Sequence, residues 1–428
     1  MALSDDPKAF PAPHGWLVLI ATALNSSFNA FMCMNFSAAP AASAAALGIT
    51  EHEAARFYSI YLFSCMLFMT PVMWQTERYE RGALLSSVMA TTVAAWMRWW
   101  ALHRMRHQYV LCAISQVLVG FGASAISTLP GQISHQRFAP TQWALTTSLM
   151  LMANYTGWLF GSSVPEVVVV EGSVSSLADL FFTQASYSGF TTISFFLLYR
   201  PLPERAARII ASENAGKSHL GGFTAVFQMM ASTPQFRLQL GTHGLFGAIG
   251  FVVPSAILFI LQDLGAPPWI GQLTNFVFIG TGVLGGVVLG ACSTDATCYP
   301  VTLKMCYVLG TAALALMCGI AYTGFLSAAT PSIMLLVLLM AVAGFATLGF
   351  TGVLFEDLAR FPNMTPSYVL WIGYEIILTV SSVLNLFASN ASGFWILAGT
   401  SMLTCMIFLT CYRQADSSWM HTPTSDIM

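Results

Sequence analysis

Two ionisable side chains lie within long apolar stretches of this sequence, Glu375 near the middle of its stretch and His243 one to two turns from the end of its own. Glu375 occurs in WIGYEIILTV and His243 in GTHGLFG. A carboxyl group inside a lipid bilayer can bind a cationic group or relay a proton, and an imidazole can ligate haem iron or change charge with pH. Each residue also has a structural interpretation, because Glu375 can bond to Tyr374 or another helix and His243 can be satisfied at a helix interface. The sequence leaves both interpretations open.

Further charged residues lie near the predicted helix ends. Arg98, in AWMRWWALHR, is flanked by tryptophans, so we expect its side chain to snorkel to the membrane surface beside an aromatic belt. Glu166 lies at the outer end of a helix, where it faces water or contributes a gate or a substrate contact. The basic residues of one outer loop form a patch that can attract carboxylate groups: His103, Arg104, Arg106 and His107.

The sequence carries no signature of an enzyme, a metal site or a nucleic-acid-binding protein. The nine cysteines show no zinc spacing, and the pair Cys292 and Cys298 supplies too few ligands for a structural zinc site. There is no Walker motif and no Ser/His/Asp arrangement. The net charge is −2 and no long basic run occurs, which argues against nucleic acid. We predict no enzymatic activity, no metal and no resident cofactor.

Membrane-spanning helices must position these residues. Hydrophobic residues make up 56% of the 428 residues and charged residues 8%, against about 25% charged in an average soluble domain. Apolar stretches of about 20 residues can cross the ~30 Å hydrocarbon core as helices. We predict an all-α membrane protein with twelve transmembrane helices, at 15–38, 57–74, 83–102, 109–129, 143–169, 177–198, 238–262, 269–291, 300–325, 331–355, 366–389 and 393–412. The first stretch lacks a cleavage site for signal peptidase, so we expect it to be retained.

The longest internal polar stretch, Arg200–Arg237, divides these helices into six plus six. The predicted organisation is a tail (1–14), an N-terminal six-helix bundle (15–198), a linker (199–237), a C-terminal six-helix bundle (238–412) and a second tail (413–428). An even number of helices places both termini on one side, which then carries twelve of the sixteen Lys and Arg residues. The positive-inside rule therefore predicts cytoplasmic termini.

Two loops in equivalent positions of the halves indicate a duplicated transporter. They are PVMWQTERYERG and GVLGGVVLGACSTD, whose acidic residues Glu77 and Asp295 are 218 positions apart. The first resembles a degenerate form of the major facilitator motif Gly-x-x-x-Asp-Arg-x-Gly-Arg, with Glu77, Arg78 and Arg81 at charged positions and Glu80 in place of a glycine. The resemblance implies a gating role, in which ion pairs hold two helices together in one conformation. An ordinary positive-inside loop is the alternative.

Within that superfamily, three stretches resemble the feline leukaemia virus subgroup C receptor family, solute carrier family 49. They are NAFMCMNF (Asn29–Phe36), LFMTPVMWQTERYERG (67–82), and the region from Gln116 to the end of NYTGWLFGSSVP (154–165). The similarity covers about the first 170 residues and is thin beyond them. It implies a major facilitator fold and transport of haem, choline or a related small organic molecule.

The same resemblance implies a substrate cavity lined by Asn29, Cys33, Asn154, Tyr155 and Phe251. In the family's choline carriers, two aromatic residues from helices 1 and 7 hold the quaternary ammonium by cation–π contacts. Here Cys33 stands at the tryptophan position and Phe251 at the tyrosine position, while Tyr155 replaces a glutamine. The cation cage is therefore reduced, and an amphipathic ring system such as haem fits no worse.

These interpretations together predict an alternating-access transporter of a small organic solute. Haem or another porphyrin is the first candidate, as cargo and not as cofactor; choline or ethanolamine is the alternative substrate, and a non-transporting membrane receptor or sensor is the alternative function. Glu375 and His243 complete the predicted substrate-binding set. The seventh helix, with Gly250 and Pro254 in GAIGFVVPS, is the expected gating element. We expect a monomer in the lipid bilayer of the plasma membrane, with the solute as its other partner.

Overall fold

The computed structural model describes residues 12–103, 107–170, 172–201, 219–322, 330–362, 364–388 and 392–412. Within these ranges the chain is helical and no strand occurs. The six long helices of the N-terminal half are α1 (Ala12–Ala38), α4 (Phe57–Arg78), α5 (Glu80–His103), α6 (Gln108–Arg137), α7 (Trp143–Val168) and α8 (Val174–Leu198). Short helices lie between them: α2 (Pro40–Leu47), α3 (Glu51–Ala55) and the 3-10 helix η1 (Pro140–Gln142). Thr50 starts α3 by a capping box with Glu53, which fixes the turn at this point.

The C-terminal half has a similar sequence of elements. They are α10 (His219–Ser232), α11 (Pro234–Asp263), α12 (Pro268–Cys292), the 3-10 helix η2 (Ala296–Cys298), α13 (Tyr299–Tyr322), α14 (Thr330–Thr347), α15 (Thr351–Leu358), α16 (Pro366–Ala388) and α17 (Gly393–Cys411). Pro234 and Pro268 stand in the first turns of α11 and α12, where the missing backbone N–H would have had no helical partner anyway.

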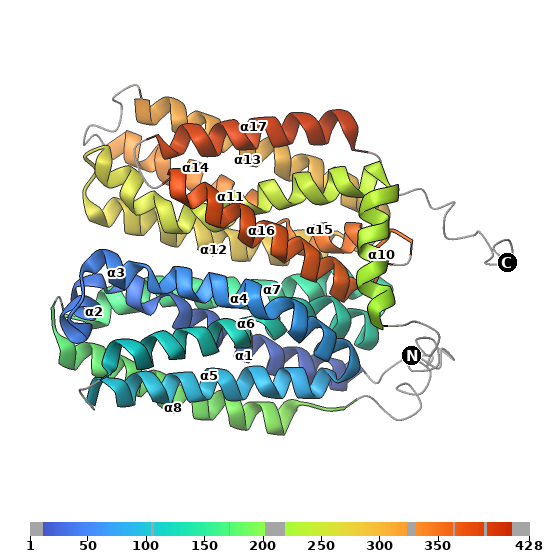
Figure 1. The fold of residues 1–428 in the computed structure, drawn as a ribbon. Coiled ribbons are helices and arrows are strands. Elements are labelled where there is room, and N and C mark those ends of the chain that lie inside the picture. Colours follow the sequence, from blue (N-terminus) through green and yellow to red (C-terminus); the bar gives the residue numbers. More distant parts are fainter. Residues whose placement is uncertain are drawn as a thin grey trace, which may run out of the picture.

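The two halves lie side by side as two helix bundles (Figure 1). The interface between them, called the seam below, is formed by α4, α6 and α7 on one side and α12, α15 and α16 on the other. Helix α10 runs across one end of the molecule (Figure 1), which we call the linker side. Phe223 of α10 packs its ring 4.9 Å from Trp371 of α16. The linker helix is therefore fixed to the C-terminal half next to the seam.

Nine helical stretches of the described residues are long and apolar enough to cross a membrane. They include α1, α4, α6, α11, α12, α13, α16, α17 and the stretch of α14 with α15. The remaining predicted spans coincide with α5, α7 and α8, which have 24, 26 and 25 residues but a less apolar composition. Apolar length alone thus supports fewer crossings than the twelve predicted.

Three other segments contain more helices than the sequence predicted. The span predicted at 331–355 is divided into α14 and α15, and the predicted linker 199–237 contains α10 and the first turn of α11. Helices α2 and α3 occupy the connection between the first two predicted spans.

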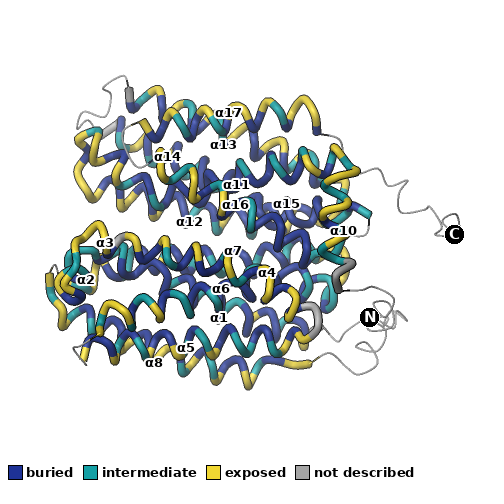
Figure 2. The backbone as a smooth tube through the Cα atoms, viewed as in Figure 1, coloured by how far each residue is buried: buried dark blue, intermediate teal, exposed yellow. Residues whose placement is uncertain are grey.

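Glycines allow the helices of each half to approach closely. A Cβ atom on Gly157 of α7 would lie 2.7 Å from Ala30 Cβ of α1, and one on Gly161 would lie 2.5 Å from the carbonyl oxygen of Phe31. Small residues at such crossings allow membrane helices to pack backbone against backbone. Figure 2 shows the result, with buried positions between the helices and exposed positions on the outer faces of the bundles. Large apolar side chains such as Phe63 and Leu386 are among the exposed ones, as expected of a surface that faces lipid.

Candidate functional site

Six aromatic side chains from both halves lie near one another at the seam. Four of them are joined by ring contacts: Tyr155 and Trp158 on α7, Phe251 on α11 and Tyr374 on α16. Tyr58 and Tyr61 on α4 stack on each other and are electrostatic neighbours of Tyr155 and Tyr374. We call these six residues the central aromatic cluster. The Phe251 ring lies 4.7 Å from Trp158, 6.0 Å from Tyr155 and 6.2 Å from Tyr374, so it joins the two halves. Each of the six side chains is at most 8% exposed. In this conformation the cluster is closed to solvent.

Two polar atoms of this cluster, one hydroxyl and one indole nitrogen, have neighbours but no well-formed hydrogen bond among the described residues. Tyr155 Oη has the side chains of Thr351 and Tyr374 as polar neighbours, but it makes no hydrogen bond of normal geometry among the described residues. The indole Nε1 of Trp158 likewise lacks one, although the thiol of Cys33 is beside it. The cluster therefore offers phenol and indole donors that a bound molecule can use.

The structure brings together part of the cavity predicted from the sequence. Tyr155 and Phe251 are in ring contact, and Cys33 lies beside Trp158. Asn29 instead donates to Thr91 Oγ1 and to the carbonyl oxygen of Val119, both at 2.9 Å. It therefore ties α1 to α5 and α6 inside the N-terminal half. Asn154 is partly buried and donates to Ser26 Oγ at 3.3 Å.

Glu375 lies next to the cluster and contacts the opposite half. Its Oε1 accepts a long hydrogen bond of 3.4 Å from Thr70 of α4, and Thr70 in turn accepts one of 3.1 Å from Trp371 Nε1. Cys65 of α4 is also near the carboxylate. Of the two structural partners considered from the sequence, Tyr374 or another helix, the structure shows the second, because Glu375 bonds to a threonine of the other bundle.

His243 is buried elsewhere, inside the C-terminal half. Its Nδ1 lies 2.9 Å from Tyr307 Oη of α13, and its ring packs 5.4 Å from Phe408 of α17. Nε2 has no hydrogen-bond partner among the described residues. The structure thus places His243 between α11, α13 and α17, apart from the central aromatic cluster.

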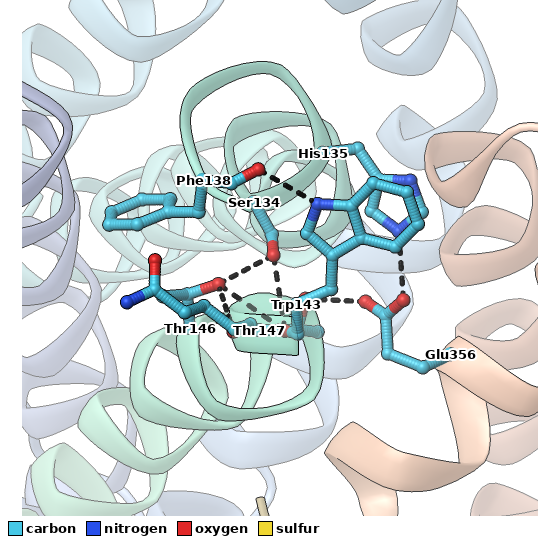
Figure 3. Close-up of polar contacts among 8 residues, drawn as sticks. Ser134, His135, Phe138, Trp143, Thr146, Thr147 and Glu356 are labelled. Atoms are coloured by element: carbon cyan, nitrogen blue, oxygen red, sulfur yellow. Dashed lines mark hydrogen bonds and ion pairs between the residues drawn. The ribbon is translucent and has the colours of Figure 1, made fainter. Parts of the chain in front are cut away.

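The linker-side part of the seam is closed by polar contacts (Figure 3). His135 Nε2 on α6 lies 2.8 Å from Glu356 Oε2 on α15, and Thr147 of α7 donates to Glu356 Oε1 at 2.7 Å. Ser367 of α16 donates to Gln132 Oε1 of α6 at 3.1 Å. These contacts were missed because the predicted spans 109–129 and 331–355 stop before His135 and Glu356. One signal in the sequence could have indicated this contact: a histidine and a carboxylate follow two predicted spans that end on the same side of the membrane.

The predicted gating loop contains an ion pair at a position that the sequence analysis did not propose for it. The side chains of Glu77 and Arg78 lie outside the described residues, and Arg81 is exposed. Glu80 Oε1 forms an ion pair of 2.6 Å with Arg137 Nη2, and the same oxygen accepts from Tyr199 Oη at 3.1 Å. The motif position expected to be glycine thus carries the carboxylate that joins α5, α6 and α8.

In the equivalent loop of the C-terminal half, Asp295 is exposed and accepts from the backbone N–H of Thr297 at 3.1 Å. It caps the short helix η2 and makes no ion pair in the described part of the chain.

The predicted hinge at Gly250 and Pro254 lies within a helix that runs without interruption from Pro234 to Asp263. A helix break lies instead in a neighbouring predicted span, between α14 and α15. A Cβ atom on Gly250 would lie 2.9 Å from the carbonyl oxygen of Thr347, the last residue of α14. Gly250 is therefore a close-packing position against the break in the neighbouring span.

The expectation that Arg98 snorkels is wrong. Its side chain is fully buried, donates to the carbonyl oxygen of Met32 at 2.7 Å and to Ser115 Oγ at 3.1 Å, and contacts Gln116 Oε1. The guanidinium also lies 5.0 Å from the Phe36 ring, as in a cation–π contact.

The two outer features predicted from the sequence lie at the surface. His103 and His107 are exposed, and Arg104 and Arg106 between them lie outside the described residues. Glu166 is exposed at the end of α7 and neighbours Gln272 of α12 across the seam.

Comparison with known proteins identifies the fold. Residues 18–364 match the sequence profile of the Major Facilitator Superfamily. A Caenorhabditis elegans protein named uncharacterized MFS-type transporter C09D4.1 is 22% identical over 243 residues, which are 54% of this chain and 41% of that protein. The chain thus matches about two fifths of the length of this relative.

Two solved structures show a similar arrangement of helices. The proton:xylose symporter XylE, bound to 6-bromo-6-deoxy-D-glucose, superposes with a TM-score of 0.68 over 95% of this chain and 97% of its own, at 15% identity. The transporter FucP in an outward conformation gives 0.67 over 94% and 100%, at 13% identity. At these identities the likeness concerns the fold alone.

Proposed function

The chain belongs to the major facilitator superfamily, and on this basis we propose that it carries a small organic solute across a membrane by alternating access. The position of the central aromatic cluster, at the seam between two helix bundles, is the observation that supports this most directly. In carriers built from two repeats, the substrate site lies at the interface of the repeats, and the bundles rock about it. We propose transport and not enzymatic catalysis.

We further propose twelve membrane crossings, with α14 and α15 together making one. Helices α5, α7 and α8 are long enough, at about 1.5 Å per residue, to cross the hydrocarbon core beside the nine more apolar stretches. The basic residues near the linker side support a cytoplasmic location for that side. In this proposal the protein is a monomer of the plasma membrane with cytoplasmic termini.

The conformation supports a state in which the linker side is shut. His135, Thr147 and Glu356 bridge the halves there, and Gln132 and Ser367 form a second bridge nearby. Transport then requires these bridges to break while the contacts within each bundle persist.

For the substrate, the chemistry of the cluster favours an organic cation, such as a quaternary ammonium or a protonated amine. The six aromatic side chains of the cluster lie at the seam. The faces of aromatic rings attract cations. Glu375 supplies a carboxylate beside them. The missing tryptophan at Cys33 is thus offset by Trp158, which lies against that residue.

Haem, the first candidate from the sequence, is less well supported. His243, for which iron ligation was one of two interpretations, is packed among aromatic rings inside the C-terminal half. The six side chains of the cluster are buried, so any solute enters only when the helices separate, and a macrocycle needs a wider separation than a small cation does. The resemblance to the feline leukaemia virus subgroup C receptor family is compatible with either cargo.

The test is uptake and efflux of labelled choline and labelled haem in cells that express the full chain. We expect choline flux that falls about tenfold or more in Glu375→Gln and Phe251→Ala, because a factor of ten corresponds to the loss of about 1.4 kcal/mol of binding. Glu51→Gln and Phe63→Ala are matched controls, since Glu51 is exposed on α3 and Phe63 is 66% exposed on α4.

Haem flux without choline flux would refute the cation proposal and keep the transporter. Choline flux that is unchanged in both variants would show that the central aromatic cluster is not the substrate site. Choline binding without flux in either direction would favour the receptor or sensor alternative.

A further inference from the structure

A carboxyl group of the C-terminal half is buried against a histidine of the N-terminal half at the linker side (Figure 3). The Glu356 side chain is 3% exposed, and that of His135, 2.8 Å away, is 21% exposed. Thr147 donates a hydrogen bond to the second carboxylate oxygen of Glu356. Glu356 is therefore shielded from water, whereas His135 reaches the solvent on the linker side and can exchange a proton with it.

The charge of this pair depends on one proton. A carboxylate in a low-dielectric interface is unfavourable unless a cation neutralises it. Within the described ranges, the ion-pair partner of Glu356 is His135. A lysine or an arginine at this position would keep its positive charge throughout the usual pH range. Histidine is the side chain that ordinarily changes its charge between about pH 5 and pH 8. We propose that His135 and Glu356 form a proton-binding site whose occupancy holds the linker side of the seam closed.

The imidazole of His135 is held in place by an aromatic neighbour. The imidazole stacks on Trp143 with a centroid distance of 3.7 Å and an interplanar angle of 14°. The indole is fixed by a hydrogen bond of 3.1 Å from its Nε1 to the carbonyl oxygen of Phe138. An aromatic face stabilises a cation placed over it. The N-terminal half thus holds the imidazole ready for a carboxylate from the other bundle.

Other titratable and charged groups nearby have contacts of their own. They are Arg137 on α6, Asp295 before η2, Tyr299 on α13, Asp357 on α15, Arg360 after α15 and Tyr368 on α16. Arg137 is paired with Glu80. Asp357 accepts from Tyr412 Oη at 3.0 Å, and Arg360 donates to the carbonyl oxygen of Ala296 at 3.3 Å.

Tyr299 lies near the Glu356 carboxylate, and its own electrostatic neighbours also include Asp357, Asp295 and Arg360. Its hydroxyl adds no positive charge to the pair. His135 is therefore the group beside Glu356 that can gain a positive charge as the pH falls through the usual range of histidine.

The direction of the pH effect follows from the two conformations. In the closed seam, protonated His135 faces a carboxylate; in the open seam, water surrounds both groups and weakens their attraction. Acid on the linker side favours closure and alkali favours opening, and the proton is taken from, and returned to, the water on that side. This inference rests on the proposed function, because it requires the linker side to open.

The opening can be followed by the distance between two spin labels. Thr141→Cys and Thr297→Cys place labels at two exposed positions, on η1 before α7 and on η2 before α13. The exposed Cys292 and Cys411, and the partly exposed Cys298, are changed to serine in the full-length chain. The distance distribution is then recorded in lipid nanodiscs from about pH 5 to about pH 8.

We expect the short-distance population to fall several-fold as the pH rises. His135→Gln and Glu356→Gln are expected to abolish this dependence, and His135→Lys to retain the short distance at every pH, because its charge persists. His14→Gln is the matched control, since His14 is exposed at the start of α1. Gly352→Trp is a wedge in the seam, because even a Cβ atom there would lie 2.8 Å from Ser148 Cα.

The outcomes separate this inference from the proposed function. A distance that responds to the wedge but not to pH, or a pH response that survives in His135→Gln, overturns the proton site and leaves alternating access intact. A distance that changes with neither the wedge nor the pH overturns both.

Discussion

Replacement of Glu80 by alanine removes the carboxylate that neutralises Arg137 inside the N-terminal half. The two side chains are 8% and 0% exposed and their charged atoms are 2.6 Å apart. Glu80 also accepts from Tyr199, and Arg137 donates a further hydrogen bond to the carbonyl oxygen of Arg200 at 2.9 Å. The variant therefore leaves a buried guanidinium without its anion, where α5, α6 and α8 meet.

The loss of one partner of a buried ion pair costs about 3–5 kcal/mol. Unfolding entropy is about 2.1 cal/mol/K per residue, or about 0.9 kcal/mol/K for the 428 residues. The melting temperature of the purified protein should thus fall by about 3–6 °C, as measured by scanning fluorimetry. Arg81→Ala, at an exposed position of the same loop, should change the stability by about 0.5 kcal/mol or less.

A double variant tests the physical reason. If the uncompensated charge of Arg137 causes the loss, Glu80→Ala combined with Arg137→Met should be more stable than Glu80→Ala alone, because the buried charge is gone. Equal melting temperatures for the single and double variants would refute this reasoning, and so would a melting temperature of Glu80→Ala that matches the wild type.

Two further changes probe the packing of each half. Gly157→Ala should destabilise the protein by about 1–3 kcal/mol, because the new methyl group would overlap α1, whereas Gly189→Ala, which has open space around its Cβ position, should be nearly neutral in the same thermal assay. Tyr412→Phe should cost about 1–3 kcal/mol of stability, because it leaves the buried Asp357 without its 3.0 Å hydrogen bond. Chemical denaturation measures this loss, with Tyr79→Phe at a 60% exposed position as the control. Equal effects of the two variants would contradict a stabilising role for the Tyr412–Asp357 bond.

The long helices could be predicted from the sequence because a bilayer imposes a length and an apolar composition on each crossing. The same criterion ends a helix where polar residues begin. It therefore stopped the fourth predicted span at Leu129, although α6 continues through PGQISHQR to Arg137. It also merged α14 and α15, because the residues between them, including Phe350, are as apolar as the helices.

The candidate site was predictable only in part. Tyr155 and Phe251 were found through the family resemblance, while Tyr58, Trp158 and Tyr374 look like ordinary core residues in an apolar helix. Their common position at the seam depends on how the two bundles dock, and hydrophobic periodicity along one helix does not specify that. Ion pairs between residues far apart in the sequence, such as the pairing of His135 with Glu356, were missed for the same reason.

The distribution of buried charge explains how one chain can be both rigid and mobile. Glu356 and Asp357 are neighbours on α15, yet Asp357 bonds to Tyr412 of its own half and Glu356 bonds to His135 of the other half. In the proposed cycle, contacts of the first kind stay buried when the bundles rock, so they can be satisfied permanently and hold each bundle as a rigid body. In the same proposed cycle the polar contacts across the seam must break, and they are made to threonine and serine hydroxyls, which water can replace, or to a histidine, whose positive charge is lost when it releases a proton. Glu375 follows the same rule, because it bonds to a threonine across the seam at the long distance of 3.4 Å; in the proposed function a solute takes the place of that partner.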